Sequence, residues 1–160
     1  MGCMQPPGVG VELRVRRARA DEHDAVATLW LRARAAAYPA IPPPAHSETE
    51  VRTWFRDHVL PDEEVWVVAA PEGLVAMMAL RGEELAQLYV APRWTGRGLG
   101  AELLGRAMRD RASLTLWAFQ ANGGARRFYE RHGFQAVAMT DGENEEGEPD
   151  VRYEWRRGGA

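Results

Sequence analysis

A glycine-rich stretch at residues 93–100, RWTGRGLG, carries the strongest chemical signal in the chain. It lies between a run of strand-forming residues and an apolar pattern with helical spacing, and it contains Gly96, Gly98 and Gly100. The first N–H groups of a helix lack intrahelical acceptors, and the positive end of the helix dipole favours an anion there. An anion can approach glycine backbone closely because no side chain intervenes. The stretch therefore predicts a pyrophosphate site, unless the glycines only let the helix and the strand pack closely.

Three phosphate ligands compete for this site. A Walker A loop requires lysine after its last glycine, and the chain contains no lysine. A dinucleotide fingerprint can be read as Gly96-x-Gly98-x-x-Ala101, but it expects an acidic residue about 20 positions on, where the next strand instead ends in Phe119-Gln120-Ala121. The third candidate is an acyl-coenzyme A, whose ADP and pyrophosphate carry several negative charges, and Arg93 and Arg97 can add charge-assisted contacts.

The elements that must position this stretch follow from the period of the apolar residues. We expect strands at 13–16, 65–70, 74–80, 85–90, 114–119, 134–139 and 151–155, and helices at 26–37, 48–59, 99–108 and 124–132. The order is strand, two helices, three strands, helix, strand, helix and two strands. It predicts an α/β fold with one mixed sheet and no repeats.

Composition places the chain among small globular proteins. Its 160 residues predict one domain at 11–157, between tails at 1–10 and 158–160. No stretch approaches the roughly 18 apolar residues of a membrane span. The single cysteine, Cys3, and the lack of a secretory or lipidation signal predict a cytoplasmic protein without membrane attachment.

Charge and reactive side chains exclude other classes of function. All 20 basic residues are arginines, spread against 23 acids, so we expect no nucleic-acid partner. The four histidines lack ligand spacing, so we expect no metal. Neither Ser47 nor Ser113 lies in a Gly-x-Ser-x-Gly elbow, which argues against hydrolysis by a serine nucleophile.

Two motifs resemble those of the GNAT N-acetyltransferase superfamily. The segment 93–98 resembles its (Arg/Gln)-x-x-Gly-x-(Gly/Ala) signature, and 122–134 resembles its Asn-x-x-Ala-x-x-Phe-Tyr-x-x-x-Gly-Phe segment. The preceding Leu88-Tyr89-Val90-Ala91-Pro92 is similar to the superfamily's fourth strand and its exit. The resemblance covers about residues 11–156. It implies a mostly antiparallel sheet whose fourth and fifth strands splay apart, and acetyl-CoA as co-substrate without a metal.

The resemblance also implies a role for each motif residue. Backbone groups of Leu88, Tyr89 and Val90 would bind the pantetheine arm, and the Val90 amide would stabilise the oxyanion. Asn122 would bind the pantetheine from the other side, and Phe128 would belong to the same cofactor site. The pyrophosphate site would comprise Arg93, Thr95, Gly96, Arg97, Gly98, Leu99, Gly100 and Ala101.

Two proton transfers are expected in such a reaction. An alkylammonium has a pKa near 10.4, so the attacking amine must lose a proton to a base or to ordered water. Glu84, slightly preferred over Glu83, is the candidate base, although both can equally be solvated acids of a turn. Tyr129 is the candidate proton donor to the leaving thiolate, or else a packed aromatic residue.

The acceptor leaves a fainter signal. The acidic connector 141–150 includes Glu145 and Glu146, which can attract a cationic amine or form only a solvated loop. Tyr38 and Trp117 are candidates to line the acceptor site. We expect acetyl transfer to a small-molecule amine or a peptide N-terminus by direct attack in a ternary complex; the alternative is a non-catalytic acyl-CoA-binding module. Strand 151–155 or its neighbour offers an edge at which two copies can form a homodimer.

Overall fold

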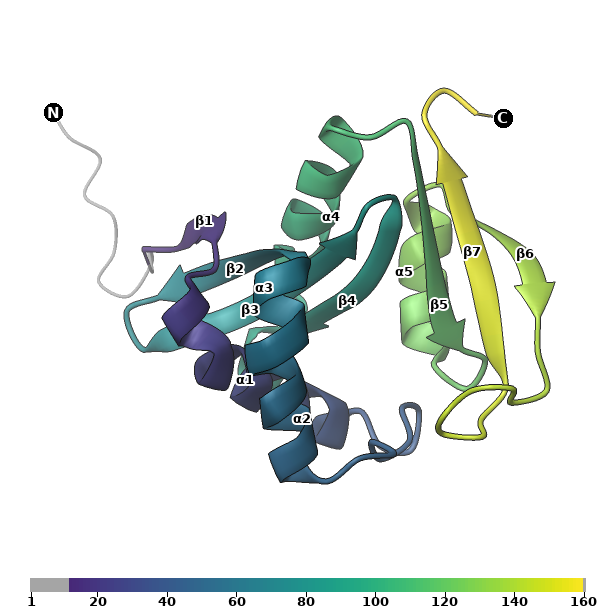
Figure 1. The fold of residues 1–160 in the computed structure, drawn as a ribbon. Coiled ribbons are helices and arrows are strands. Elements are labelled where there is room, and N and C mark those ends of the chain that lie inside the picture. The colour runs from purple at the N-terminus through teal and green to yellow at the C-terminus, as the bar shows by residue number, and fades with distance from the viewer. Residues whose placement is uncertain (1–11, 160) are drawn as a thin grey trace, which may run out of the picture.

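Seven strands of the described part of the chain form one sheet (Figure 1). The computed structural model describes residues 12–159, so the predicted N-terminal tail with Cys3 and the last residue of the predicted C-terminal tail lie outside the described residues. The strands are β1 (Arg14–Arg17), β2 (Glu64–Ala70), β3 (Gly73–Arg81), β4 (Glu84–Val90), β5 (Ser113–Phe119), β6 (Gln135–Met139) and β7 (Asp150–Arg156). The helices are α1 (His23–Ala36), α2 (Glu48–Trp54), α3 (Leu60–Asp62), α4 (Leu99–Arg109) and α5 (Gly123–Arg131).

The strand order across the sheet is β1-β2-β3-β4-β5-β7-β6. Every neighbouring pair is antiparallel except β4 and β5, which are parallel. The predicted mixed, mostly antiparallel sheet is therefore confirmed. The sequence predicts a free edge at strand 151–155 or at its neighbour. The first choice is wrong, because β7 lies between β5 and β6, and its neighbour β6 forms the edge.

The predicted splay of the two central strands is also confirmed. β4 and β5 share one registered pair, Glu84 with Thr115, and then diverge (Figure 1). A register shift against β3 leaves Ala86 as an extra residue between the paired positions Leu85 and Gln87. Such a bulge bends its strand. The backbone of residues 88–90 that faces β5 consequently has no strand partner in the described sheet.

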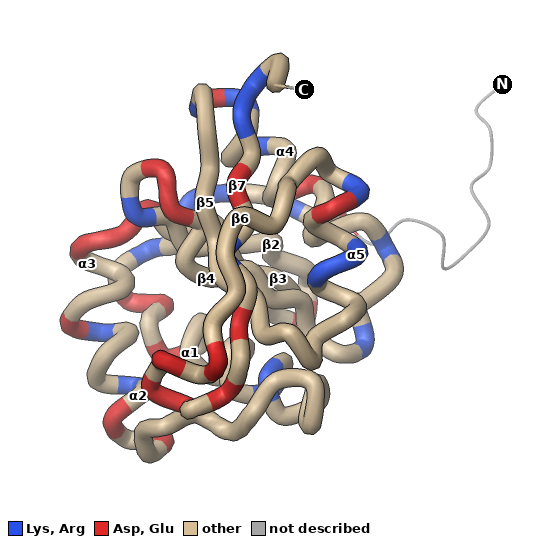
Figure 2. Tube along the Cα trace, turned by 90° about the vertical axis from the view of Figure 1, so that its right-hand side faces the viewer, with Lys and Arg blue, Asp and Glu red and all other residues tan. Residues whose placement is uncertain are grey.

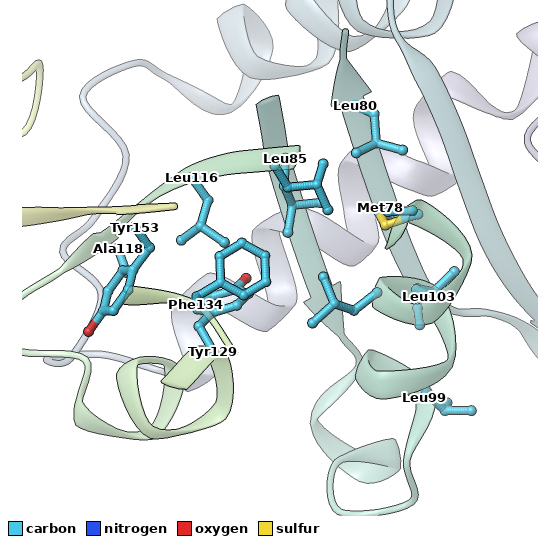
Figure 3. Close-up of a cluster of buried hydrophobic side chains, with 14 of the residues drawn as sticks. Met78, Leu80, Leu85, Leu99, Leu103, Leu116, Ala118, Tyr129, Phe134 and Tyr153 are labelled. Carbon is cyan, nitrogen blue, oxygen red and sulfur yellow. The ribbon is translucent and has the colours of Figure 1, made fainter. Parts of the chain in front are cut away.

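Two cores lie on the two faces of the sheet. Side chains alternate along a strand, so on β3 Met77 packs with α1 and α2, while Met78 packs with α4 and α5. The core that contains Met78 also contains Leu103 of α4 and Tyr129 of α5, and it extends under the region where β4 and β5 separate (Figure 3). The apolar packing on both faces makes the sheet a rigid support for loops at its splayed end.

The helical segment after the proline-rich connector, residues 39–47, begins at Glu48 as the sequence predicts. The Ser47 hydroxyl accepts a hydrogen bond from the Glu50 amide at 3.2 Å, and the Glu50 carboxylate accepts one from the Ser47 amide at 3.0 Å. This capping box satisfies two backbone donors at the start of α2. Within residues 12–159, no helix has the length and apolar character that crossing a membrane requires.

Candidate active site

A cleft of about 720 Å³ opens where β4 and β5 separate. One wall consists of Leu88 and Val90 at the end of β4, and another of the glycine loop and the first residues of α4. Phe128 and Tyr129 of α5 form the opposite wall. The structure thus brings both sequence motifs, which are about 30 residues apart in the chain, to one cavity.

Backbone geometry explains two of the glycines. Gly96 and Gly98 have φ angles of 76° and 82°, in the left-handed region where other residues are strained. A Cβ at either position would contact nothing within 4 Å, so the space in front of them is open. Gly98 begins α4 without any side-chain cap. The amides of the first turn of α4 are therefore available to an anion in the cleft.

The two arginines of the loop lie outside the cleft wall. The Arg97 guanidinium carbon lies 4.5 Å from the ring centre of Trp94, a buried residue that does line the cleft. Arg93 is exposed to solvent. Thr95 lines the cleft, and its hydroxyl donates to the Pro92 carbonyl at 3.1 Å. Phosphate binding by Arg93 and Arg97 stays a prediction.

Asn122 and Phe128 have structural roles that the sequence only partly indicates. The Asn122 side-chain oxygen accepts a hydrogen bond from the Ala125 amide at 3.2 Å, so Asn122 caps α5. Phe128 lies at the point where a Cβ on Gly100 would be 3.5 Å from its ring. This is an ordinary van der Waals distance, so a side chain at position 100 would pack against Phe128 beside the cleft.

Tyr129 lines the cleft and is also packed in the core. Its ring makes edge contacts with Phe128 and Phe134, at centroid distances of 5.2 and 5.5 Å. Burial raises the pKa of the Tyr129 phenol far above its usual range, and the nearby Tyr89 phenol adds to the effect. The phenol is therefore protonated at any physiological pH, the state that a proton donor requires.

The predicted carboxylate bases lie at the other end of β4. Glu84 is six residues before Val90, roughly 20 Å along an extended strand. Its carboxylate is bound by the Arg81 guanidinium, and the Glu83 carboxylate accepts a hydrogen bond from the Ser113 hydroxyl at 2.8 Å. Neither residue lines the cleft. The base assignment stays a prediction, and the structure does not bring it together with the other site residues.

The Tyr89 side chain points away from the cleft, toward α1. Its phenol accepts a hydrogen bond from Arg34 at 3.1 Å, and burial raises its pKa although Arg34 partly opposes this. A cavity of about 750 Å³ lies on this side of β4 and is lined by Trp30, Gln87, Glu145 and Glu146 among others. Tyr89 thus lies in sequence between Leu88 and Val90, which line the coenzyme cleft, and its phenol contacts Arg34, which lines this second cavity; Tyr89 itself lines neither.

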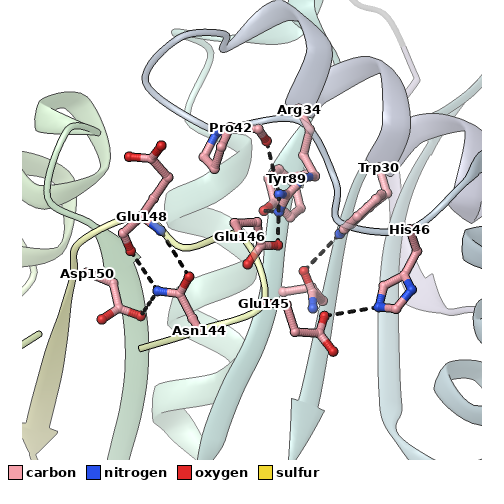
Figure 4. A network of polar contacts seen from close by, with 11 residues as sticks. Trp30, Arg34, Pro42, His46, Tyr89, Asn144, Glu145, Glu146, Glu148 and Asp150 are labelled. Atoms are coloured by element: carbon pink, nitrogen blue, oxygen red, sulfur yellow. Dashed lines mark hydrogen bonds and ion pairs between the residues drawn. The ribbon is translucent and has the colours of Figure 1, made fainter. Parts of the chain in front are cut away.

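The acidic connector, residues 141–150, is rich in acidic residues (Figure 2), and its Glu145 and Glu146 line this second cavity beside His46 and Arg34 (Figure 4). Glu145 lies 3.2 Å from Nε2 of His46, and this contact, together with Glu50, raises the pKa of His46. The Glu146 carboxylate lies 3.5 Å from Nη2 of Arg34. The two predicted acceptor residues thus line one cavity, but each already has a basic partner.

The two aromatic acceptor candidates are separated. Trp117 is 48% exposed and lines a cavity of about 430 Å³ together with Glu143 and Glu146. Tyr38 is 65% exposed and lines a different cavity, of about 680 Å³, beside the proline-rich connector. Glu146 lines both the Trp117 cavity and the second cavity, whereas Tyr38 lines neither of them.

Sequence reasoning missed four residues at these sites. Trp30 donates to the Gln87 side chain at 2.8 Å, and Arg34 and His46 hold the acidic connector. His132 lines the coenzyme cleft with its Nδ1 2.7 Å from the Phe128 carbonyl. Only the four-residue spacing of Trp30 and Arg34 on one helix face could have indicated a shared site. Among the described residues, no group of His, Cys, Asp and Glu could hold a metal ion.

The sequence is similar to those of known acetyltransferases. Residues 61–136 match the model of the acetyltransferase (GNAT) domain. The peptidyl-lysine N-acetyltransferase YiaC of Escherichia coli K12 is 29% identical over 124 residues, which cover 77% of this chain and 84% of YiaC. The peptidyl-lysine N-acetyltransferase YjaB of Salmonella typhimurium LT2 is 26% identical over 130 residues, which cover 81% of this chain and 88% of YjaB.

Solved structures agree on the fold. Apo YjaB from Escherichia coli superposes with a TM-score of 0.72 at 24% identity, covering 90% of this chain and 97% of YjaB. The PaiA N-acetyltransferase of Thermoplasma acidophilum, solved with coenzyme A, superposes with a TM-score of 0.67 at 17% identity, covering 91% and 99%. The splayed sheet with a glycine loop at a helix start is the scaffold of a coenzyme A-dependent acyltransferase. Residues 61–136 thus match a GNAT acetyltransferase domain, and the relatives named N-acetyltransferases agree with it; acetyl-CoA is the co-substrate of GNAT acetyltransferases.

Proposed function

We propose that this protein transfers the acetyl group of acetyl-CoA to the side-chain amine of a peptidyl lysine. The observation that carries the proposal is the meeting of the glycine loop, Val90 and Tyr129 in one cleft. The loop amides suit the pyrophosphate, and the unpaired end of β4 suits the pantetheine. The names of the curated relatives, which are peptidyl-lysine N-acetyltransferases, support lysine as the acceptor.

The reaction proceeds by direct attack in a ternary complex. The neutral amine nitrogen attacks the thioester carbonyl carbon, and the Val90 amide donates a hydrogen bond to the developing oxyanion. The C–S bond then breaks as the adduct collapses. The thiolate takes its proton from the Tyr129 phenol, and the proton lost by the nitrogen restores that phenol through solvent. One further proton leaves the acceptor ammonium before attack.

That first proton goes to water or to a carboxylate base, for which Glu84 stays our candidate. Arg81 binds the Glu84 carboxylate, so proton transfer from the amine would have to pass along β4 through ordered water. A rate that is unchanged in Glu84→Gln would assign the step to solvent alone.

The acidic connector supports a cationic acceptor. Glu145 and Glu146 line the cavity beside Tyr89, whose neighbour in sequence is the oxyanion residue Val90. An acceptor ammonium can displace His46 from Glu145, whose contact is 3.2 Å long, and it can donate to the Glu146 oxygen that Arg34 does not use. A lysine side chain would place its ammonium at this position while the peptide lies over the connector.

Turnover distinguishes this function from the alternative of a non-catalytic acyl-CoA-binding module. The protein would be incubated with acetyl-CoA and with peptides that carry either a free α-amine or a lysine behind a blocked N-terminus. The proposal predicts thiol release and a mass increase of one acetyl group on the lysine peptide. Acetylation of the free α-amine alone would instead support the peptide N-terminus, and tight binding without any turnover would support the module.

We also propose a cytoplasmic location, because the reaction consumes acetyl-CoA, and a homodimer formed through β6. All five β6 residues are exposed, and Val137 and Met139 are 51% and 60% exposed on this edge strand. A molar mass of two chains by light scattering, reduced to one chain by Val137→Lys, would support the dimer.

A further inference from the structure

Arg34 is a buried cation near the end of β4 that the proposed chemistry does not use. Its side chain is 7% exposed, and α1 holds it between Trp30 and Tyr89 (Figure 4). A buried charge is unfavourable unless several partners compensate it. The partners of Arg34 therefore indicate why the chain keeps a charge at this position.

Those partners come from three separate segments. Nη1 donates to the Tyr89 phenol of β4 at 3.1 Å, and Nη2 donates to the Pro42 carbonyl of the proline-rich connector at 3.3 Å. Nη2 also lies 3.5 Å from the Glu146 carboxylate of the acidic connector. The guanidinium carbon lies 4.5 Å from the ring centre of Trp30, which supports its flat face. One side chain thus joins segments that are 55 and 112 residues from it in the sequence.

The position of Arg34 relates these contacts to the acceptor. Arg34 lines both the cavity of about 750 Å³ beside Glu145 and Glu146 and the cavity of about 680 Å³ beside the proline-rich connector. It therefore forms the wall between them. The Nε atom of Arg34 is buried without a hydrogen-bond partner among the described residues, and the two Nη2 contacts are long. Packing between the three segments therefore holds the guanidinium more than hydrogen bonds of ideal length do.

We propose that Arg34 is a positioning residue for the acceptor: it holds Glu146 and the acidic connector against β4 and so sets the distance between the acceptor ammonium and the thioester. This inference rests on the proposed function, and it assigns no contact between Arg34 and the reacting atoms. Glu146 uses one carboxylate oxygen for Arg34, so its other oxygen can accept a hydrogen bond from the acceptor.

Lysine cannot replace arginine in this role. The three segments are reached by two different nitrogens of one planar fork, whereas an ammonium is a single point of charge on a flexible chain. Arg34→Lys therefore keeps the charge but loses at least one of the three contacts. The comparison of Arg34→Lys with Arg34→Met separates the effect of the charge from that of the fork.

Steady-state kinetics and hydrogen exchange test the proposal together. We expect Arg34→Met and Arg34→Lys to raise the KM for the lysine peptide by about tenfold, while the Kd for acetyl-CoA changes less than about twofold. Amide exchange in residues 141–149 should accelerate in both variants. Arg56→Met, which removes an exposed arginine that lines neither cavity, is the matched control and should change none of these values.

Coupling with Glu146 is the second readout. If Arg34 acts through Glu146, Arg34→Met should raise the KM in the Glu146→Gln background by less than about twofold. An unchanged acceptor KM, or equal losses in acceptor and acetyl-CoA binding, would overturn the proposal. If the wild-type protein acetylates no amine, the proposed function fails. Faster amide exchange at 141–149 in the Arg34 variants would still support Arg34 as the residue that holds the acidic connector. Unchanged exchange there would refute that role.

Discussion

Glu84 of β4 and Thr115 of β5 form the one registered pair between the two parallel strands in the described sheet. The Thr115 amide also donates to the Glu83 carbonyl at 2.8 Å, so the strands are joined firmly at this end alone. Beyond it, the strands separate and α5 lines the gap with Phe128 and Tyr129. The coenzyme cleft is thus a consequence of strand pairing that stops after one residue pair.

Tyr129→Phe should lower kcat at least about tenfold and leave the Kd for acetyl-CoA nearly unchanged, because the variant removes a proton donor without changing the packing. The raised pKa of Tyr129 predicts that its role persists beyond about pH 10, where an exposed phenol would ionise. Tyr153→Phe is the matched control, since Tyr153 is a buried tyrosine of the same core whose hydroxyl bonds Arg126 at 3.0 Å away from the cleft (Figure 3). Equal rates for Tyr129→Phe and wild type would remove Tyr129 from the chemistry.

Gly98 should be sensitive both to strain and to charge. Gly98→Ala is expected to destabilise the protein by about 1–2 kcal/mol because its φ of 82° disfavours an L side chain. Gly98→Glu adds a negative charge beside the pyrophosphate site and should weaken acetyl-CoA binding by more than about tenfold beyond Gly98→Ala. Gly105→Glu, at an open position inside α4, is the control and should bind normally. Equal Kd values for Gly98→Ala and Gly98→Glu would contradict an anion site at this loop.

The acidic connector should determine acceptor affinity. Replacing Glu143, Glu145 and Glu146 with glutamine is expected to raise the KM for a cationic peptide several-fold, and the effect should shrink as salt screens the charges. Glu148→Gln, an exposed change on the same connector, should leave the KM unchanged. A KM that is insensitive to all three replacements would reduce this connector to a solvated turn.

Acid stability should depend on Glu22. Two hydrogen bonds of 2.8 Å from Arg16 lower the pKa of the Glu22 carboxyl from 4.5 to about 2. A carboxyl whose pKa is lower in the folded state stabilises the protein above about pH 4.5, and this contribution is lost as the pH falls toward about 2. Glu22→Gln should therefore lower the free energy of unfolding by about 1–3 kcal/mol at pH 6 and by little near pH 2. Urea unfolding of both proteins at the two pH values checks this, and a difference that does not vary with pH would contradict it.

Most of the fold follows from local patterns. The short apolar runs in β2 and β3 and the capping box at Ser47 depend on neighbouring residues, so the sequence predicts them directly. Which strand forms the edge of the sheet was harder to predict, because the position of β7 between β5 and β6 depends on pairing between strands distant in sequence. The bulge at Ala86 likewise has no glycine or proline that would indicate it.

The coenzyme site was predictable and the acceptor site was not, for a physical reason. Glycines in left-handed conformations and a helix start are local features, so the segment 96–101 indicates its own role. The acceptor cavity instead depends on contacts such as Arg34 with Glu146 and His46 with Glu145, which join residues about 100 positions apart. Arg34 in particular lies in an apolar helix pattern, where no local signal distinguishes a buried arginine from an exposed one.

Titration calorimetry of the wild-type protein with acetyl-CoA, with ATP and NAD as controls, tests the central claim most directly. We predict micromolar binding of acetyl-CoA with one site per chain and no binding of NAD or ATP at the same concentrations. Binding of NAD or ATP in place of acetyl-CoA, or no binding of any of the three, would contradict the assignment of the cleft to the coenzyme and the acetyl transfer derived from it.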